Sequence, residues 1–241
     1  MKISEVIAPL EKWAPLSLQE SYDNAGLIIG DATKECTGAL ICLDVTDAVM
    51  DDAAERGYNL IIAHHPLVFS GLKRLNGKSM VERLTIRAIR DDVAIYAIHT
   101  NLDNIIGGVN HRLAEQLGLA NCRILRPMKG NLRKLVVFCP VGNVEAVRAA
   151  IFDAGAGMIG NYDSCSFNVA GQGTFKAGKG ANPYVGEIDS LHTEDEIRIE
   201  TILPDYLQNT VVRSMVKAHP YEEVAYDIYP LSNSNEKAGA G

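Results

Sequence analysis

The sequence predicts an α/β protein with a partial parallel-sheet domain over residues 1–125 and a ferredoxin-like α+β domain over residues 126–232, then a flexible tail over residues 233–241. In the first part, short β-branched runs alternate with helical stretches, the order that produces parallel strands. The second part reads β-α-β-β-α-β, which is the ferredoxin-like order. Between the two, the pattern breaks near residues 122–131, where proline and glycine interrupt it.

The expected elements of the first domain begin with a helix over residues 4–13, for which Ser4 is a possible cap. Residues 20–26 are expected to form a loop, because Asp23 and Asn24 suit a turn. Thr46 caps a further helix that Gly57 ends. The remaining elements are strands at 39–43, 60–63 and 93–98 and helices at 80–90 and 107–116.

The expected elements of the second domain include one strand with a clear alternation. Along residues 196–203, apolar Ile197, Ile199 and Leu203 alternate with mostly polar residues, which indicates a strand with one buried face. The other expected elements are strands at 132–139, 164–170 and 223–229 and helices at 144–154 and 206–218.

The composition excludes several classes of partner. The formal charge is −7 and no basic stripe is present, which argues against nucleic-acid binding. No apolar run is long enough to cross a membrane, and the N-terminus has no signal-peptide pattern. The five cysteines are scattered and form no CxxC motif, which is typical of a reduced, cytoplasmic protein.

Metal-binding residue types follow two of the expected strands. His64 and His65 come directly after one apolar run, and His99 and Asp103 follow the next. Because the carboxyl ends of parallel strands meet at one edge of a sheet, these side chains form one candidate site. Imidazole and carboxylate together suit zinc, manganese or iron. Taken singly, each histidine is more often a hydrogen-bonded core residue.

The spacing of the paired histidines bears on how many ions they could hold. Pro66 favours an extended backbone at His65. Neighbouring side chains of an extended segment point to opposite sides, so His64 and His65 are expected to serve two different ions. Asp44 ends a strand at the same edge, either as a partner of the site or as a helix cap.

Three motifs resemble a known family: His64-His65-Pro66, His99-Thr-Asn-Leu-Asp103 and Tyr22-Asp-Asn-Ala-Gly-Leu27. The chain is similar along essentially its whole length to the GTP cyclohydrolase I type 2 homologues, also called NGG-one-interacting-factor-three-like proteins. The resemblance implies two divalent ions, one anchored by His64 and the other by His65. It implies Asp103 as a further ligand, and His99 as a proton relay or substrate-orienting residue.

The resemblance also implies an activity and an assembly. The implied function is a metal-dependent hydrolase acting on a small molecule, with a nucleotide as one candidate substrate; GTP ring opening rests on the resemblance alone. Residues 162–167, 171–175 and 219–223 match an inserted domain that resembles PII and copper-tolerance proteins. The family also implies a homo-oligomer, a hexamer. The rival expectation is a non-catalytic metal-binding or regulatory protein that acts through this inserted domain.

The last residues, 233–241, depart from the family pattern. In the family the insert is followed by a second half of the outer domain, which carries a histidine and a glutamate ligand, and neither is present here. Three of five ligands are therefore expected. The partial first domain is expected to bind metal weakly, to expose a sheet edge and to self-associate.

Three further patterns have mostly structural interpretations. Residues 155–160 fit G-x-G-x-x-G, but a helix precedes them where the fingerprint needs a strand. Residues 173–179 mimic a phosphate loop without the following Ser or Thr and are expected to be a glycine-rich loop between strands; an anionic ligand is left open, because the loop offers its amides and two lysines. His219 to Glu223 is expected to be a loop-to-strand junction, with a minor ligand role left open. His111 is expected to lie on the surface or in the core.

Overall fold

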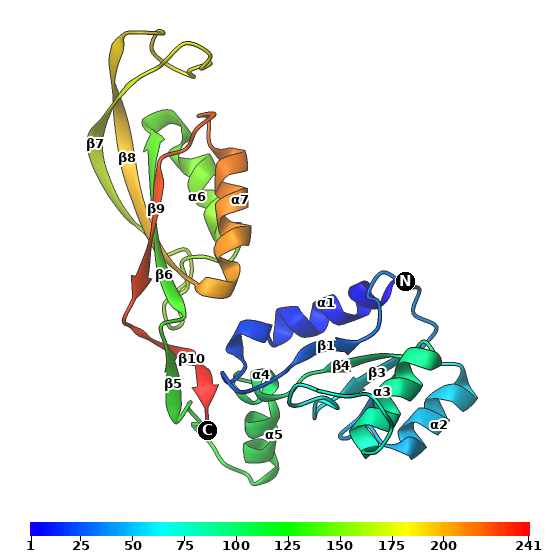
Figure 1. Cartoon of the computed structure of the whole chain (residues 1–241). Coiled ribbons are helices and arrows are strands. Elements are labelled where there is room, and N and C mark those ends of the chain that lie inside the picture. The colour runs from blue at the N-terminus through cyan, green and yellow to red at the C-terminus, as the bar shows by residue number, and fades with distance from the viewer. The chain divides into compact units, whose positions relative to one another are not determined.

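The computed structural model describes residues 1–241 and separates into two compact units (Figure 1). The first unit comprises residues 1–127 and 237–241, and the second comprises residues 128–236. The chain leaves the first unit two residues after the expected boundary at 125. None of the helices is long and apolar enough to span a bilayer.

The first unit is built on a four-stranded sheet in the order β1-β4-β3-β2. Strands β2, β3 and β4 are parallel, as predicted, whereas β1 is antiparallel to β4. Strand β1 was not predicted, because it is short and follows directly on a loop. The bounds are β1 (Gly26–Ile29), β2 (Ala39–Cys42), β3 (Leu60–Ala63) and β4 (Ala94–Ala97).

The helices of this unit begin and end largely where their caps predict. The Thr46 hydroxyl accepts a hydrogen bond from the Val49 amide (3.3 Å), and Gly57 ends α2 in the left-handed conformation. Helix α1 begins before Ser4, with Lys2 as its cap residue. The short helix α4 was not predicted. The bounds are α1 (Ile3–Trp13), α2 (Asp47–Arg56), α3 (Met80–Arg90), α4 (Thr100–Asp103) and α5 (Val109–Gln116), and a single 3₁₀ turn, η1, spans Leu16–Leu18.

The two central strands are buried on both faces. Every residue of β3 and β4 is buried, which explains why their sequences are continuous apolar runs. Helices α2 and α3 pack Met50 and Leu84 against Ile61 and Ile95 of the sheet. In Figure 1, α1 lies on the other side of the sheet. This packing holds the carboxyl ends of β3 and β4 side by side.

The second unit has a four-stranded antiparallel sheet in the order β7-β8-β6-β9. With its two helices this is the predicted ferredoxin-like fold. Helices α6 and α7 cover one face of the sheet (Figure 1). The strands are β6 (Leu132–Pro140), β7 (Phe167–Lys176), β8 (Leu191–Pro204) and β9 (Tyr226–Leu231); the helices are α6 (Val144–Asp153) and α7 (Gln208–Ala218), with 3₁₀ turns η2 (Val141–Asn143) and η3 (Asp205–Leu207).

The predicted alternation along β8 decides which face of this sheet is the core. Ile199 and Leu203 pack with Leu135 of β6 and Met215 of α7 in the core of the unit. The intervening residues, Glu196 among them, lie on the face that the helices leave uncovered.

The glycines at 155–160 form a turn rather than a nucleotide-binding loop. They follow α6, and Gly155, Gly157 and Gly160 all have positive φ. Ile159 and Tyr162 form an isolated bridge around Gly160, so no helix begins there. The structure therefore agrees with rejecting the dinucleotide fingerprint.

The expectation of a flexible tail over residues 233–241 is wrong. Residues Ser234–Ala240 form strand β10, which pairs with β5 (Arg126–Lys129). Ala238 is buried, and the Gly239 amide donates to the Asn104 carbonyl (2.8 Å). The segment has little intrinsic β-propensity, so these non-local contacts make it a strand.

We expect Gly239→Ala to destabilise the first unit. Gly239 has a φ of +144°, and an added Cβ would lie 2.2 Å from the Arg126 carbonyl oxygen. Strain of this kind costs about 1–3 kcal/mol, which thermal unfolding measures directly. Gly71→Ala is the matched control, because an added Cβ there has no atom within 4 Å. Equal melting temperatures for the two variants would contradict the packing of β10.

We also expect residues 128–236 to fold when expressed alone, because they contain a complete sheet and their own core. The isolated segment should unfold in one cooperative thermal transition. Leu135→Ala, at a fully buried position, should lower its free energy of unfolding by about 2–5 kcal/mol. A segment without a cooperative transition would show that this unit depends on the rest of the chain.

Candidate metal centre

Three histidines meet at the carboxyl ends of β3 and β4. His64, His65 and His99 each offer a ring nitrogen, and these atoms all lie within 4.8 Å of one another. The ring centroids are 5.2, 5.4 and 5.6 Å apart. The parallel register pairs Ala63 with Ala97, so residues that follow the two strands become neighbours. The structure thus brings together residues that the sequence separates by 35 positions or fewer.

The paired histidines do not point to opposite sides of the chain. The expectation from strand alternation is wrong here, because β3 ends at Ala63 and both histidines lie in a bend. Alternation holds only while the backbone stays extended. The rings of His64 and His65 therefore lie side by side and can face a common site.

Each of the three imidazoles is held by a hydrogen bond at Nδ1. His64 Nδ1 donates to the Ile98 carbonyl oxygen (2.8 Å) and His65 Nδ1 to Asp44 Oδ1 (2.8 Å). His99 Nδ1 donates to Asp23 Oδ1 (2.7 Å). Carbonyl and carboxylate oxygens only accept, so each Nδ1 carries the proton. Nε2 is left as a lone-pair donor on all three rings, the arrangement typical of metal-binding histidines.

Asp23 is the buried partner of this group. Its side chain is fully buried and also accepts hydrogen bonds from the amide (3.0 Å) and the hydroxyl of Thr100. Burial raises the pKa of the Asp23 carboxyl, but hydrogen bonds from His99 and Thr100 outweigh it and hold this pKa below its usual value. Asp23 is therefore a carboxylate that orients His99.

The loop that carries Asp23 is fastened to the loop after β3. Asn24 Nδ2 donates to the Val68 carbonyl oxygen (2.6 Å). The sequence analysis assigns Asp23-Asn24 to a turn and includes both residues in a motif of the family resemblance, and in the structure this loop lies beside the histidine group. In the sequence, only the Tyr22–Leu27 motif pointed to a role for Asp23 at the site. Composition alone does not reveal that a carboxylate is buried beside a histidine 76 positions away.

Asp103 lies at the edge of the histidine group. It ends α4, and its Oδ1 is 3.8 Å from His64 Nε2. It does not belong to the set whose donor atoms are all within 4.8 Å of one another. Asp103 is thus placed to share a metal ion with His64. His99 was expected to relay protons or orient the substrate, but its ring nitrogen belongs to the three-histidine set, so it could also be a metal ligand.

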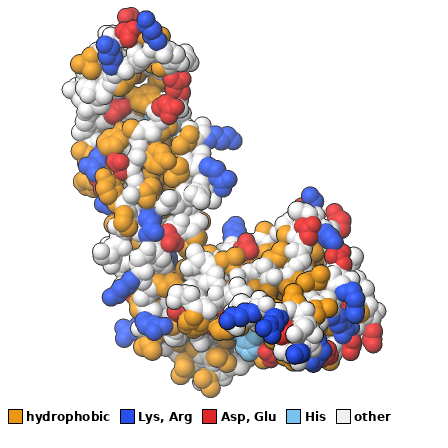
Figure 2. Space-filling model, in the orientation of Figure 1, with side chains coloured by type: hydrophobic (Ala, Val, Ile, Leu, Met, Phe, Trp, Pro, Cys, Tyr) orange, Lys and Arg blue, Asp and Glu red, His pale blue; other side chains and the backbone are white.

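The donor set suits a divalent metal ion. Borderline ligands such as imidazole favour zinc, manganese or iron over the hard cations calcium and magnesium. The side chain of His65 is 46% exposed, whereas those of His64 and His99 are 20% and 18% exposed. Histidine atoms also reach the surface on the face seen in Figure 2 (pale blue). A bound ion would therefore be held from one side by the chain and be open to small molecules from the other.

The other histidines have structural partners. His111 is 3.3 Å from Glu115 on the surface of α5, in line with the sequence analysis. His219 is buried, and its Nε2 donates to the Phe138 carbonyl oxygen (2.9 Å). Burial lowers the pKa of His219, so the ring stays neutral. His192, the third of them, pairs with Glu194 (2.8 Å between His192 Nε2 and Glu194 Oε2).

Comparison with known proteins places this geometry in context. The model of the Duf34/NIF3 (NGG1p interacting factor 3) family matches residues 1–208. A Halalkalibacterium halodurans protein named GTP cyclohydrolase 1 type 2 homolog is 45% identical over 100% of this chain and 66% of its own length. A Bacillus subtilis protein of the same name is 42% identical over 98% of this chain and 64% of its own. The chain thus spans just under two thirds of these relatives.

Solved structures similar to this chain include a protein of the same family. A Bacillus cereus protein related to NIF3 has a TM-score of 0.85 and 46% identity, covering 99% of this chain and 64% of that one. A Staphylococcus aureus protein has a TM-score of 0.66 and 30% identity, covering 99% of this chain and 62% of that one.

We expect Asp23→Asn to weaken zinc binding at the histidine group. An asparagine cannot match the charged acceptor that fixes the ring of His99, and loss of such a partner typically costs about 10–100-fold in metal affinity. Titration with zinc against a competing chelator measures the change. Asp31→Asn is the control, because Asp31 also accepts hydrogen bonds, from Thr33, but in an exposed turn. Equal affinities for both variants would contradict the role assigned to Asp23.

Proposed function

Because the chain belongs to the Duf34/NIF3 (NGG1p interacting factor 3) family, we propose that it carries the metal-binding histidines of a metal-dependent hydrolase for a small substrate. The observation that supports this most is that one ring nitrogen from each of three histidines lies within 4.8 Å of the others, while each ring is held by a hydrogen bond at Nδ1. Structural histidines rarely leave three unpaired nitrogens facing one another, because each unpaired nitrogen loses a hydrogen bond.

We propose two divalent ions as the cofactor. His64 with Asp103 and His65 provide separate anchors, since Asp103 lies beside His64 but outside the three-histidine set. Zinc, manganese and iron all suit these donors. A divalent ion held there supplies Lewis acidity and acidifies a coordinated water.

His99 contributes in one of two ways, and Asp23 suits both. With Nδ1–H held by Asp23, the free Nε2 can donate to an ion or take a proton from the reacting group. A carboxylate behind a histidine stabilises the imidazolium that forms when the ring takes a proton. Nearby, Phe69 packs edge-on against His99, with ring centroids 6.2 Å apart.

The substrate class follows from the relatives rather than from the site. Proteins that match most of this chain are named GTP cyclohydrolase 1 type 2 homologs, so a nucleotide is the first substrate to test. We place the reaction in the cytoplasm, in keeping with five free cysteines. We also propose self-association, supported by the edge strand β2, where Ile41 is 79% exposed.

A non-catalytic role is the second candidate. It is favoured by a cavity of about 580 Å³ in the second unit, whose lining includes none of the three histidines. In that case the histidine group would hold a metal without turnover, and ligand binding to the second unit would be the activity.

The test is turnover of a nucleotide panel that includes GTP by protein loaded with zinc, manganese or iron(II). We expect product to form, and His64→Gln to lower both the bound metal and the rate by at least about 100-fold, because removing one ligand loosens the ion. His111→Gln is the matched control, since it removes a half-exposed histidine that pairs with Glu115 on α5.

His99→Gln distinguishes the two roles of that residue. Loss of metal together with activity identifies a ligand, whereas loss of rate with full metal content identifies a proton carrier. Tight metal binding without turnover of any nucleotide would contradict hydrolysis and favour the non-catalytic candidate.

A further inference from the structure

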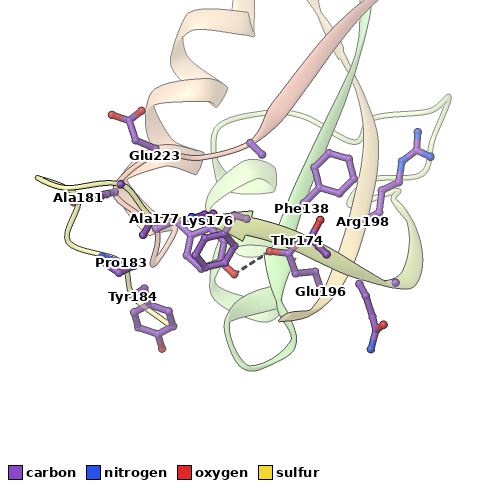
Figure 3. A pocket seen from close by; sticks show the side chains of 18 residues that line it. Phe138, Thr174, Lys176, Ala177, Ala181, Pro183, Tyr184, Glu196, Arg198 and Glu223 are labelled. Carbon is purple, nitrogen blue, oxygen red and sulfur yellow. Dashed lines mark hydrogen bonds between the residues drawn. The ribbon is translucent and has the colours of Figure 1, made fainter. Parts of the chain in front are cut away.

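The second unit contains a cavity that the candidate metal centre does not use. It has a volume of about 580 Å³, within the range of about 300–1,000 Å³ that small-molecule sites occupy. It lies over the uncovered face of the sheet, on β7 and β8, and is closed by the loop after β7 and by residues 221–225 (Figure 3). All its lining residues belong to the second unit.

The floor of this cavity carries a buried carboxylate. Glu196 is 8% exposed, and its Oε1 accepts a hydrogen bond from the Tyr221 hydroxyl (2.9 Å), drawn as the dashed line in Figure 3. Glu196 takes part in none of the ion pairs of its sheet. Its neighbour on the same face, Arg198, pairs instead with Glu200 (2.9 Å). A buried negative charge without a cation is costly, so the site lacks its counter-charge.

A glycine makes room for this carboxylate. Gly173 of β7 lies on the same face as Glu196, and an added Cβ there would be 2.2 Å from Glu196 Oε2. Two cationic residues, Lys176 of β7 and Arg198 of β8, also line the cavity. Lys176 is exposed and forms no ion pair with Glu196, and Arg198 pairs with Glu200. Neither therefore supplies a counter-charge to Glu196.

Aromatic rings form the wall beside the carboxylate. The ring centroid of Tyr221 is 6.2 Å from that of Phe175 and 6.2 Å from that of Tyr184, and both pairs are tilted. Aromatic faces attract organic cations, and the attraction increases in a site shielded from water. A carboxylate with several adjoining rings is the combination that recognises ammonium groups.

The wall is held in place by its own hydrogen bonds. The Tyr221 amide donates to His219 Nδ1 (3.1 Å), while His219 Nε2 donates to the Phe138 carbonyl oxygen (2.9 Å). The amide of Asn182 in the covering loop donates to Glu222 Oε1 (2.8 Å). The segment 219–223, for which the sequence left a ligand role open, thus orients the ring that contacts Glu196.

We infer that this cavity binds a small organic cation, with its ammonium group on Glu196 and its carbon skeleton against the aromatic wall. The apolar lining accommodates an alkyl or aryl body, and the carboxylate supplies the missing counter-charge. A neutral or anionic ligand of the same shape would leave Glu196 without a cation.

The test compares three probes of one shape on the full chain: pentylammonium, 1-pentanol and pentanoate. Binding is followed by NMR shifts of the Gly171 and Gly173 amides, which line the cavity. We expect pentylammonium to bind at least about tenfold more tightly than 1-pentanol, because charge-assisted hydrogen bonds are the stronger ones, and pentanoate to produce no shift. This comparison needs no variant.

Two variants test whether Glu196 causes the preference for pentylammonium over 1-pentanol. Glu196→Gln keeps an acceptor for Tyr221 but removes the charge, and should reduce the preference for pentylammonium to less than about twofold. Gly173→Ala keeps the charge and displaces the carboxylate, with the same expected loss. Glu145→Gln is the matched control, since that exposed residue pairs with Arg148 on α6 and does not line the cavity.

Equal binding of pentylammonium and 1-pentanol by the natural chain would overturn the inference. A preference that survives in folded Glu196→Gln protein would also overturn it, as would tighter binding of the anion.

Discussion

The parallel pairing of β3 with β4 is the constraint on which the candidate metal centre depends. Its register sets Ala63 beside Ala97, so the residues that leave the two strands emerge at one edge of the sheet. Both strands are buried on both faces, which prevents them from slipping without exposing apolar side chains. The edge is therefore rigid, and the backbone bend after Ala63 turns both of the following histidines towards His99.

A second layer of contacts makes this edge chemically specific. Ile98, Asp44 and Asp23 each accept a hydrogen bond from one histidine, and they come from three different segments. The three segments converge only in the folded chain, so the tautomer of each ring depends on tertiary structure. The same holds in the second unit, where the position of Glu196 depends on the absence of a side chain at Gly173 of another strand.

Much of the fold follows from local pattern. The bounds of β3 and α3 match those expected from their sequences, and the caps Thr46 and Gly57 locate α2. The elements that the sequence did not predict share one physical cause. Strand β1 has four residues and begins directly after a loop at Gly26, which has a positive φ, and β10 contains no β-branched residue. Pairing partners far along the chain therefore decide both strands. Helix α4 has four residues, too few for a periodic pattern.

By itself the sequence determined the two-part α/β organisation, the strand ends that carry His64, His65, His99 and Asp103, and the resemblance that groups them. Those features depend on local periodicity and on residue types at strand ends, which are readable along the chain. Tertiary structure alone decided that Asp23 is the buried partner of His99, that the paired histidines face the same way, and that Glu196 lies in an aromatic cavity. Each of these is a contact between residues distant in sequence, where orientation and burial, rather than residue type, determine the chemistry.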